Sequence, residues 1–134
     1  KSADISEADV IVACGRIFKS EEDLALAEEL ARLLGGAVAV TRPLVEAGIR
    51  DAKYQIGLSG RTVSPKLIIT LGVSGAVQFT AGMNSSETII SINKDPNAAI
   101  FGVSHYGIVG DVFEIVPELI KKLKAELKAE RNVG

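Results

Sequence analysis

Small and charged residues follow the short apolar runs of this sequence, and their types suit the binding of a phosphorylated ligand. The clearest example is Gly72-Val73-Ser74-Gly75, which follows the apolar run 66–71 and precedes a predicted helix. Glycines allow a close approach of the backbone to a ligand, and free N–H groups at a helix start attract an anion. Ser74 can either cap that helix or donate to a phosphate oxygen. An ordinary capped turn would have the same composition, so this element alone leaves both interpretations open.

The other apolar runs end in polar residues of similar kinds. Arg16 follows the first run, Thr41 and Arg42 end the second, and Asn93 and Asp111 follow the last two. A guanidinium is costly to bury without an anion, so the two arginines indicate where negative charge would lie unless a nearby carboxylate pairs with them. Asn93 and Asp111 could contact a ribose or an adenine, or could simply form turns.

No set of residues for acid–base or nucleophilic catalysis can be recognised. His105 is the single histidine and Cys14 the single cysteine, so neither a Ser/His/Asp set nor a zinc site can be assembled. We expect His105 in a surface turn and Cys14 as a buried small hydrophobe. A ligand cleft without a catalytic base is typical of a protein that carries a cofactor, because the cofactor then supplies the chemistry.

Strands alternating with helices must position these residues. The continuous apolar run 10–14 predicts a strand that is buried on both faces of a parallel sheet, and further strands are predicted over residues 37–41, 66–71, 88–92 and 106–109. The alternation predicts an α/β fold: a doubly wound, mostly parallel sheet with helices on both faces, similar to a Rossmann domain. In such folds ligands bind at the carboxyl ends of the strands, where the strand order reverses.

The helices follow from apolar periodicity and from capping residues. Helices are predicted over residues 20–34, over residues 75–83 and at the C-terminus, where Pro117 is expected in the first turn. Residues 42–64 are predicted to be irregular, and such a long polar stretch inside a small domain is usually functional or mobile.

Composition and charge exclude several classes of partner. The net charge is −2 and the aromatic content 4%, which disfavours nucleic-acid binding. No apolar run has the length of a membrane span, so no membrane insertion is expected. A single cysteine fits a reducing compartment, either the cytoplasm or, in a eukaryote, the mitochondrial matrix.

Six motifs occur in order along the chain and carry a family resemblance. They are VACGR (residues 12–16), TRP (41–43), QIGLSGRTVSP (55–65), GVSGAVQ (72–78), INKDP (92–96) and YGIVGD (106–111). Together they resemble the electron transfer flavoprotein alpha subunit, from about residue 7 to residue 123. The resemblance implies an FAD-binding domain that relays electrons, and so an electron carrier rather than an enzyme with its own substrate.

The resemblance also implies which residues hold FAD. Arg42 would lie over the isoalloxazine ring and stabilise its reduced, anionic forms, and the Ser59 hydroxyl would bond flavin N5. Arg16 and Ser74 would serve the pyrophosphate, and Asn93 and Asp111 the adenosine end. The full implied set is Arg16, Thr41, Arg42, Gln55, Ile56, Gly57, Ser59, Gly72, Ser74, Gly75, Gln78, Asn93 and Asp111.

The implied assembly is larger than this chain. Members of the family pair with a beta subunit, accept electrons from acyl-CoA or other dehydrogenases and deliver them to a quinone- or ferredoxin-linked reductase. Because a further alpha-subunit domain normally precedes this one, residues 1–8 are expected to be a linker remnant. Residues 9–128 would form the FAD-binding domain and residues 129–134 a C-terminal tail.

Three segments depart from the family pattern. Leu58-Ser59-Gly60 replaces the common Gln-Thr-Gly, and Ile17 replaces the second glycine of Gly-Arg-Gly. Phe79 replaces a histidine that is expected to donate to flavin O2, and a phenyl ring cannot donate. Two alternatives stay open: a nucleotide-binding oxidoreductase domain of related fold, and a non-redox assembly domain with a degenerate cofactor site. The first would need an acid or base near the ring, and the retained polar residues argue against the second.

Overall fold

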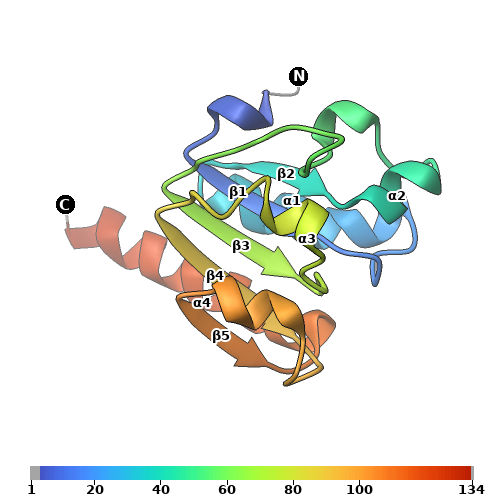
Figure 1. Cartoon of the computed structure of the whole chain (residues 1–134). Coiled ribbons are helices and arrows are strands. Elements are labelled where there is room, and N and C mark those ends of the chain that lie inside the picture. Colours follow the sequence, from blue (N-terminus) through green and yellow to red (C-terminus); the bar gives the residue numbers. More distant parts are fainter. Residues whose placement is uncertain (1–3, 134) are drawn as a thin grey trace.

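The computed structural model describes residues 4–133, and these contain one sheet of five parallel strands (Figure 1). The strands are β1 (Val10–Cys14), β2 (Ala37–Val40), β3 (Leu67–Leu71), β4 (Thr88–Asn93) and β5 (Tyr106–Val109). Their spatial order is β2-β1-β3-β4-β5, which is one of the two common doubly wound orders. The predicted α/β, doubly wound fold is therefore confirmed, and every strand pair is parallel.

The central strands β1 and β3 are buried on both faces, which explains their uninterrupted apolar sequences. Residues 11–14 of β1 are each 0% exposed. The register pairs Cys14 with Val40 on one side and with Leu71 on the other. Three neighbouring strands therefore end level with one another, so the residues that follow them emerge side by side at one edge of the sheet.

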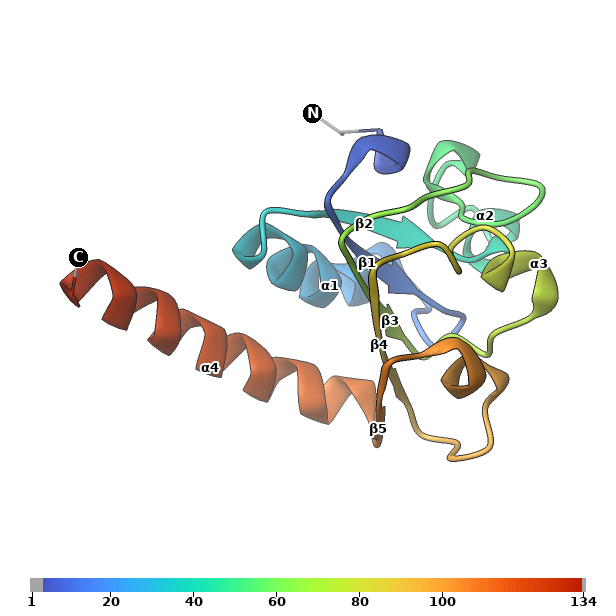
Figure 2. The same ribbon diagram turned by 60° about the vertical axis from the view of Figure 1, so that its left-hand side comes forward.

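Two long helices, α1 (Glu21–Leu33) and α4 (Val112–Val133), cover one face of the sheet (Figure 2). One apolar cluster joins them to the strands and includes Val12, Leu24, Leu30, Ile69, Val116 and Ile120. The last turns of α4 extend beyond the sheet. Residues 129–133, which were predicted to belong to a C-terminal tail, are part of this helix. No helix among the described residues is both long and apolar enough to cross a bilayer.

Side-chain caps set where these two helices begin. The Ser20 hydroxyl accepts a hydrogen bond from Asp23 N at 3.1 Å, as the sequence predicted. At the other helix, the Asp111 carboxylate accepts from Phe113 N at 2.9 Å. This cap starts α4 well before Pro117, so the expected position of Pro117 in the first turn is wrong. Pro117 lies in the second turn, where it removes the bond that an N–H would donate to the Phe113 carbonyl.

Shorter segments cover the opposite face. They are the 3-10 helices η1 (Ile5–Glu7) and η3 (Ala99–Val103) and the helix α3 (Val77–Thr80). Side chains from these segments and from the loop after residue 55 form a second apolar cluster against the sheet: Ile5, Ile11, Ile56, Val63, Ile68, Phe79, Met83, Ile89 and Ile100. Ile5 is thus buried although it lies in the predicted linker; residues 1–3 and 134 lie outside the described residues, and the domain boundaries stay a prediction.

Two predictions about local structure on this side are corrected. The helix expected over residues 75–83 is reduced to four residues, because Gly75 adopts a φ of 94° and keeps the preceding turn out of the helix. The stretch 42–64, expected to be irregular, contains helix α2 (Arg42–Glu46) and the 3-10 helix η2 (Ala52–Tyr54). Pro43 lies in the first turn of α2, where proline favours a helix start.

A chain of hydroxyl groups crosses the buried second face. Thr70 Oγ1 donates to Ser91 Oγ at 2.7 Å. Ser91 and Ser104 Oγ lie 2.7 Å apart, and Ser104 Oγ donates to the Ile100 carbonyl at 2.7 Å. Because each hydroxyl has one proton, all three bonds run in one direction, from β3 through β4 to η3. The chain therefore ties η3 to the sheet through the fully buried Ser91.

Ser91→Ala should destabilise the protein by about 2 kcal/mol, because the Thr70 hydroxyl would be left buried without its acceptor. The measurement is the free energy of unfolding from urea denaturation followed by circular dichroism. Ser64→Ala, at an exposed position, serves as the control and should change stability by no more than about 0.5 kcal/mol. Equal unfolding midpoints for the two variants would contradict the hydroxyl chain.

Candidate functional site

A cleft of about 360 Å³ opens at the carboxyl ends of β1 and β3. From β1 the chain passes outward to β2, whereas from β3 it passes in the opposite direction to β4, so the cleft lies at the point where the strand order reverses. This is the place where doubly wound folds bind their ligands. Eleven of the thirteen predicted site residues line it: Arg16, Thr41, Arg42, Gln55, Ile56, Gly57, Ser59, Gly72, Ser74, Gly75 and Gln78.

The turn between β3 and α3 lines the cleft and contains a row of backbone amides without a protein acceptor. Gly72 and Gly75 adopt φ values of 67° and 94°, which bend the chain sharply here. Within the described residues, the N–H groups of residues 73–78 donate to no protein acceptor. The turn is held from behind, because Ile100 N donates to the Ser74 carbonyl at 2.9 Å. Successive free amides of this kind form a concave site for an anion.

This turn corrects the predicted source of anion attraction. The sequence analysis assigned the attraction to a helix start with its dipole, but α3 has a single turn and its cap residue is Ala76. The Ser74 hydroxyl does not cap the helix and is exposed, so it remains free to face a ligand. The free amides of residues 77 and 78 begin this single turn, so the predicted first-turn N–H groups are present without a long helix behind them.

The ends of β1 and β3 touch at two glycines. A methyl group on Gly15 would lie 2.2 Å from the carbonyl oxygen of Gly72, so no larger residue fits between the two strand ends. Arg16 follows Gly15 on the surface and forms no ion pair with any described residue. Ile17, which stands where the family has a glycine, packs against Gly72. A free guanidinium beside the row of amides reinforces the anion site.

The opposite side of the cleft is formed by the loop 55–61. Ile56 N donates to the Val40 carbonyl at 3.1 Å, which fixes the loop to the end of β2. Leu58 N donates to the Gln78 carbonyl at 3.0 Å, which fixes it to α3. Within the loop, Gln55 Nε2 donates to Ser59 Oγ at 3.2 Å. This wall is polar at Gln55 and Ser59 and apolar elsewhere, which suits a flat heteroaromatic ring with a polar edge.

Arg42 begins α2 at the rim of the cleft, and it pairs with a local carboxylate. Arg42 Nε donates to Glu46 Oε2 at 2.8 Å, and both side chains are mostly exposed. The salt-bridge interpretation of Arg42 is therefore correct for Nε. Its two terminal nitrogens have no partner among the described residues, so they remain available to a ligand. An exposed pair of this kind contributes little to stability.

Asn93 and Asp111 do not line the cleft. Asn93 Nδ2 donates to the Val73 carbonyl at 2.9 Å, which supports the amide turn from behind, and its Oδ1 accepts from Asp95 N. Asp111 caps α4. These bonds favour the turn-forming interpretation of both residues, and their contacts with an adenosine stay a prediction.

The remaining reactive side chains lie away from the cleft. Burial raises the pKa of the Cys14 thiol far above its usual range, so the thiol stays neutral. His105 Nδ1 accepts from Ile89 N at 2.9 Å, near the amino end of β4 and thus at the opposite edge of the sheet. No cluster of three or more metal-ligating side chains occurs in residues 4–133.

Some lining residues were missed by the sequence analysis of the site. They contribute main chain or apolar surface rather than a functional group: Gly15, Pro43, Leu58, Val73, Ala76 and Phe79. All six lie within or beside the motifs described above, and this proximity in sequence is the signal that could have indicated them. A row of free amides or an apolar wall cannot be found by searching for side-chain chemistry.

A parallel, doubly wound sheet with a cleft at its switch point is the architecture of nucleotide-cofactor-binding domains. A model of the electron transfer flavoprotein FAD-binding domain matches residues 4–84. The chain belongs to this family, as its motifs indicated, and the cofactor of the family is FAD.

Relatives support the family assignment over nearly the whole chain. The lactate dehydrogenase (NAD(+),ferredoxin) subunit LctC of Acetobacterium woodii is 59% identical over 92% of this chain and 30% of its own length. The electron transfer flavoprotein subunit alpha of Bacillus subtilis is 50% identical over 90% of the chain and 37% of its own length. Protein FixB of Azotobacter vinelandii is 46% identical over 95% of this chain and 35% of its own length. The chain thus spans about a third of the length of these relatives.

Gly15→Ala should disrupt the cleft, because the new methyl group would collide with the Gly72 carbonyl, a backbone atom that cannot rotate away. We expect a loss of about 2–3 kcal/mol in the free energy of unfolding and weaker FAD binding. Gly102→Ala is the matched control, since a methyl group there meets nothing within 4 Å. Urea denaturation and FAD titration check both variants; a Gly15→Ala protein that behaves like Gly102→Ala would show that the strand ends can separate freely.

Proposed function

We propose that this chain binds FAD in the cleft and acts as the flavin-carrying domain of an electron transfer flavoprotein. The observation that carries the proposal is the row of free amides at residues 73–78, facing a loop with a polar and an apolar side across one cleft. A pyrophosphate needs several donors at close range, and a flavin ring needs a flat, partly apolar wall with hydrogen-bonding groups. Both are present at the site where the fold binds ligands.

The two ends of the cleft take different parts of the cofactor in this proposal. The amides of residues 73–78, with Arg16 and the Ser74 hydroxyl, hold the pyrophosphate. The loop 55–61, with Gln55 and Ser59, holds the ring. The adenosine extends from the amide turn toward the ends of β4 and β5, where Asn93 and Asp111 lie.

The residues around the ring would tune the cofactor rather than react. When bound, FAD supplies the acceptance and release of electrons. Arg42 contributes a fixed positive charge at the rim, which favours the negative charge that a flavin gains on reduction. Phe79, 5% exposed, gives an apolar contact where a donor is common in the family. The absence of an evident acid or base at the cleft supports a carrier rather than an enzyme with its own substrate.

The partners in this proposal are a beta subunit, acyl-CoA or other dehydrogenases that donate electrons, and a quinone- or ferredoxin-linked reductase that accepts them. The rim of the cleft supports docking there, because Leu58 is 68% and Val77 74% exposed. Large apolar side chains exposed at a site mark an interaction surface. We place the protein in the cytoplasm, or in the mitochondrial matrix of a eukaryote.

The chain should bind one equivalent of FAD without a covalent bond, and FMN at least about tenfold more weakly, because FMN lacks the AMP half and so has neither the adenosine nor the second phosphate for the amide turn. ADP should compete with FAD. Absorption spectra and fluorescence titration of the purified chain test this. Equal affinity for FMN and FAD would contradict the assignment of the amide turn. A colourless protein that rejects FAD would support an assembly domain instead.

Arg42→Ala should lower the reduction potential of the bound flavin and leave FAD bound through its phosphates. At an effective dielectric constant of about 20, an exposed arginine should shift a two-electron potential by roughly 20–40 mV, equivalent to about 1–2 kcal/mol. Phe79→His should raise the potential, because an added donor stabilises charge on the ring. Spectroelectrochemical titration of the assembled flavoprotein measures both shifts.

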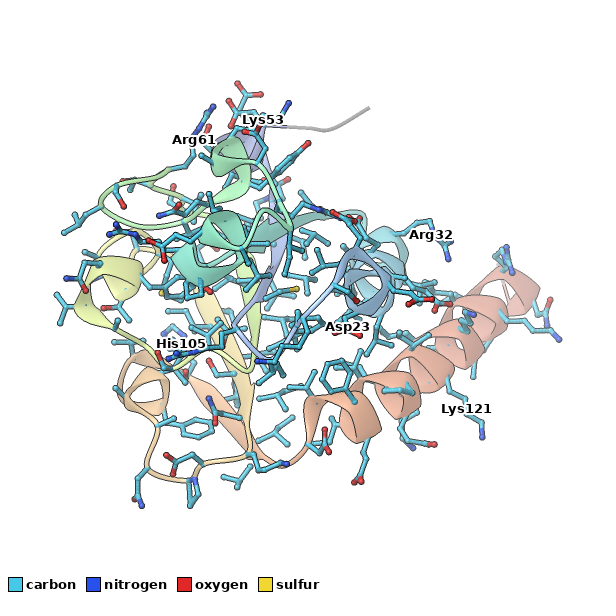
Figure 3. All side chains as sticks on the ribbon, turned by 90° about the vertical axis from the view of Figure 1, so that its right-hand side faces the viewer. Asp23, Arg32, Lys53, Arg61, His105 and Lys121 are labelled. Carbon is cyan, nitrogen blue, oxygen red and sulfur yellow. The ribbon has the colours of Figure 1, made fainter. Side chains whose placement is uncertain are left out.

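Two control variants separate a local effect of Arg42 from a change in net charge. Arg32→Ala removes an exposed arginine from α1, away from the cleft (Figure 3), and should leave the potential unchanged. Glu46→Gln removes the carboxylate that pairs with Arg42 and should raise the potential slightly. An unchanged potential in Arg42→Ala with FAD still bound would show that Arg42 serves the surface salt bridge alone.

A further inference from the structure

A cluster of three charged side chains fastens the segment after α2 to helix α1. Arg50 Nε donates to Glu21 Oε2 at 3.1 Å, and Arg50 Nη2 donates to Glu21 Oε1 at 3.3 Å and to Glu28 Oε2 at 2.7 Å. The Arg50 side chain is 16% exposed, far less than the side chains of its two partners. Arg50 is therefore held by charge-assisted bonds on two sides, which is stronger than an ordinary surface pair.

The segment that Arg50 fastens has few other anchors. Residues 51–53 are exposed, and between α2 and the loop 55–61 the side chains of Ile49 and Tyr54 are half-buried. The Arg50 guanidinium carbon lies 5.7 Å from the centre of the Tyr54 ring, within the range of a cation–π contact. Tyr54 in turn packs against both apolar clusters. Arg50 thus connects α1, Tyr54 and the start of the loop 55–61.

The loop 55–61 begins directly after Tyr54. Gln55 is 6% exposed and its side chain reaches Ser59. Both residues line the cleft. A shift of Tyr54 would therefore move the two polar side chains of this wall, while the amide turn at residues 73–78 belongs to a different part of the chain and is supported by η3.

We propose that Arg50 is a positioning residue for the ring end of the cleft, an inference that rests on the proposed FAD binding. By binding Glu21 and Glu28 it holds residues 49–54 against α1 and sets the position of Tyr54, where the loop 55–61 begins. The bonds of Ile56 to β2 and of Leu58 to α3 hold the rest of the loop. Without the ion pairs of Arg50, residues 49–54 sample other positions. The flavin ring then binds only to the molecules in which the loop has the position that accepts it. The apparent affinity falls in proportion to the population of that competent state.

The test compares two ligands on the purified 134-residue chain. FAD uses both ends of the cleft, whereas ADP lacks the ring and uses only the amide turn and the adenosine side. Arg50→Met removes the charge and keeps an unbranched apolar stem. We expect FAD affinity to fall about tenfold, as for a tenfold smaller competent population, while ADP affinity changes less than about twofold. Arg50→Lys keeps the charge but not the planar guanidinium, so its FAD affinity should lie between those of the wild type and of Arg50→Met.

Further variants link the effect to the ion pairs. Glu28→Gln should reproduce part of the loss in FAD affinity, and combining it with Arg50→Met should add little, because both remove one interaction. Arg32→Met is the control: Arg32 is an exposed arginine on α1, the helix that carries Glu21 and Glu28, and it has no ion pair among the described residues (Figure 3). It should leave both affinities unchanged. Amide hydrogen exchange of ligand-free Arg50→Met should increase over residues 51–60 and stay unchanged over residues 10–14.

The affinities for FAD and ADP separate a positioning role of Arg50 from a general effect on stability and from a failure of the proposed function. Equal losses of FAD and ADP affinity in Arg50→Met would assign Arg50 to general stability and overturn the positioning role. Unchanged affinity for FAD in Arg50→Met and in Glu28→Gln would also overturn it, while the proposed function would stand. A wild-type chain that binds ADP but not FAD, or neither ligand, would refute the proposed function and this inference together.

Discussion

The parallel pairing of β1 with β3 is the contact on which the rest of the structure depends. It brings two strand ends side by side, and each strand is followed by a glycine: a methyl group on Gly15 would collide with the Gly72 carbonyl, and one on Gly72 would collide with Ile17. The chain leaves these two ends in opposite directions, so the cleft opens between the two departing segments. Everything that lines the cleft is placed by this pairing: the amide turn on one side, and the loop bonded to β2 on the other.

Much of this arrangement could be predicted from the sequence, because its signals are local. Uninterrupted apolar runs exist where a strand is covered on both faces, as residues 10–14 are. The glycines after β1 and β3 mark a sharp turn or a close contact whatever the fold. The motifs place Arg42, Gln55, Ser59 and Ser74 at the ends of neighbouring strands or in the loop between them, and the structure brings these four to one cleft.

What could not be predicted depends on partners that are distant in sequence. The length of α3 is set by the backbone of Gly75 and by η3 packing against it, and neither has a periodic signature. Asp111 is a carboxylate after a strand, which reads equally as a ligand contact or as a helix cap until the start of α4 is known. Arg50 resembles any loop arginine in the sequence; its two glutamates lie 22 and 29 residues earlier.

The anion site is made of main-chain groups, whereas the opposite wall is made of side chains. A substitution to any residue other than proline at position 76, 77 or 78 changes a side chain but leaves the backbone N–H in place. In the loop 55–61 and at the rim of the cleft the functional groups belong to side chains, so a single substitution can remove each of them. Evolution can therefore vary the surroundings of a bound ring, position by position, while the main-chain amides of the proposed phosphate site stay in place. Leu58, Ser59 and Phe79 depart from the family pattern around the ring end of the cleft, whereas the two glycines of the amide turn, Gly72 and Gly75, match it.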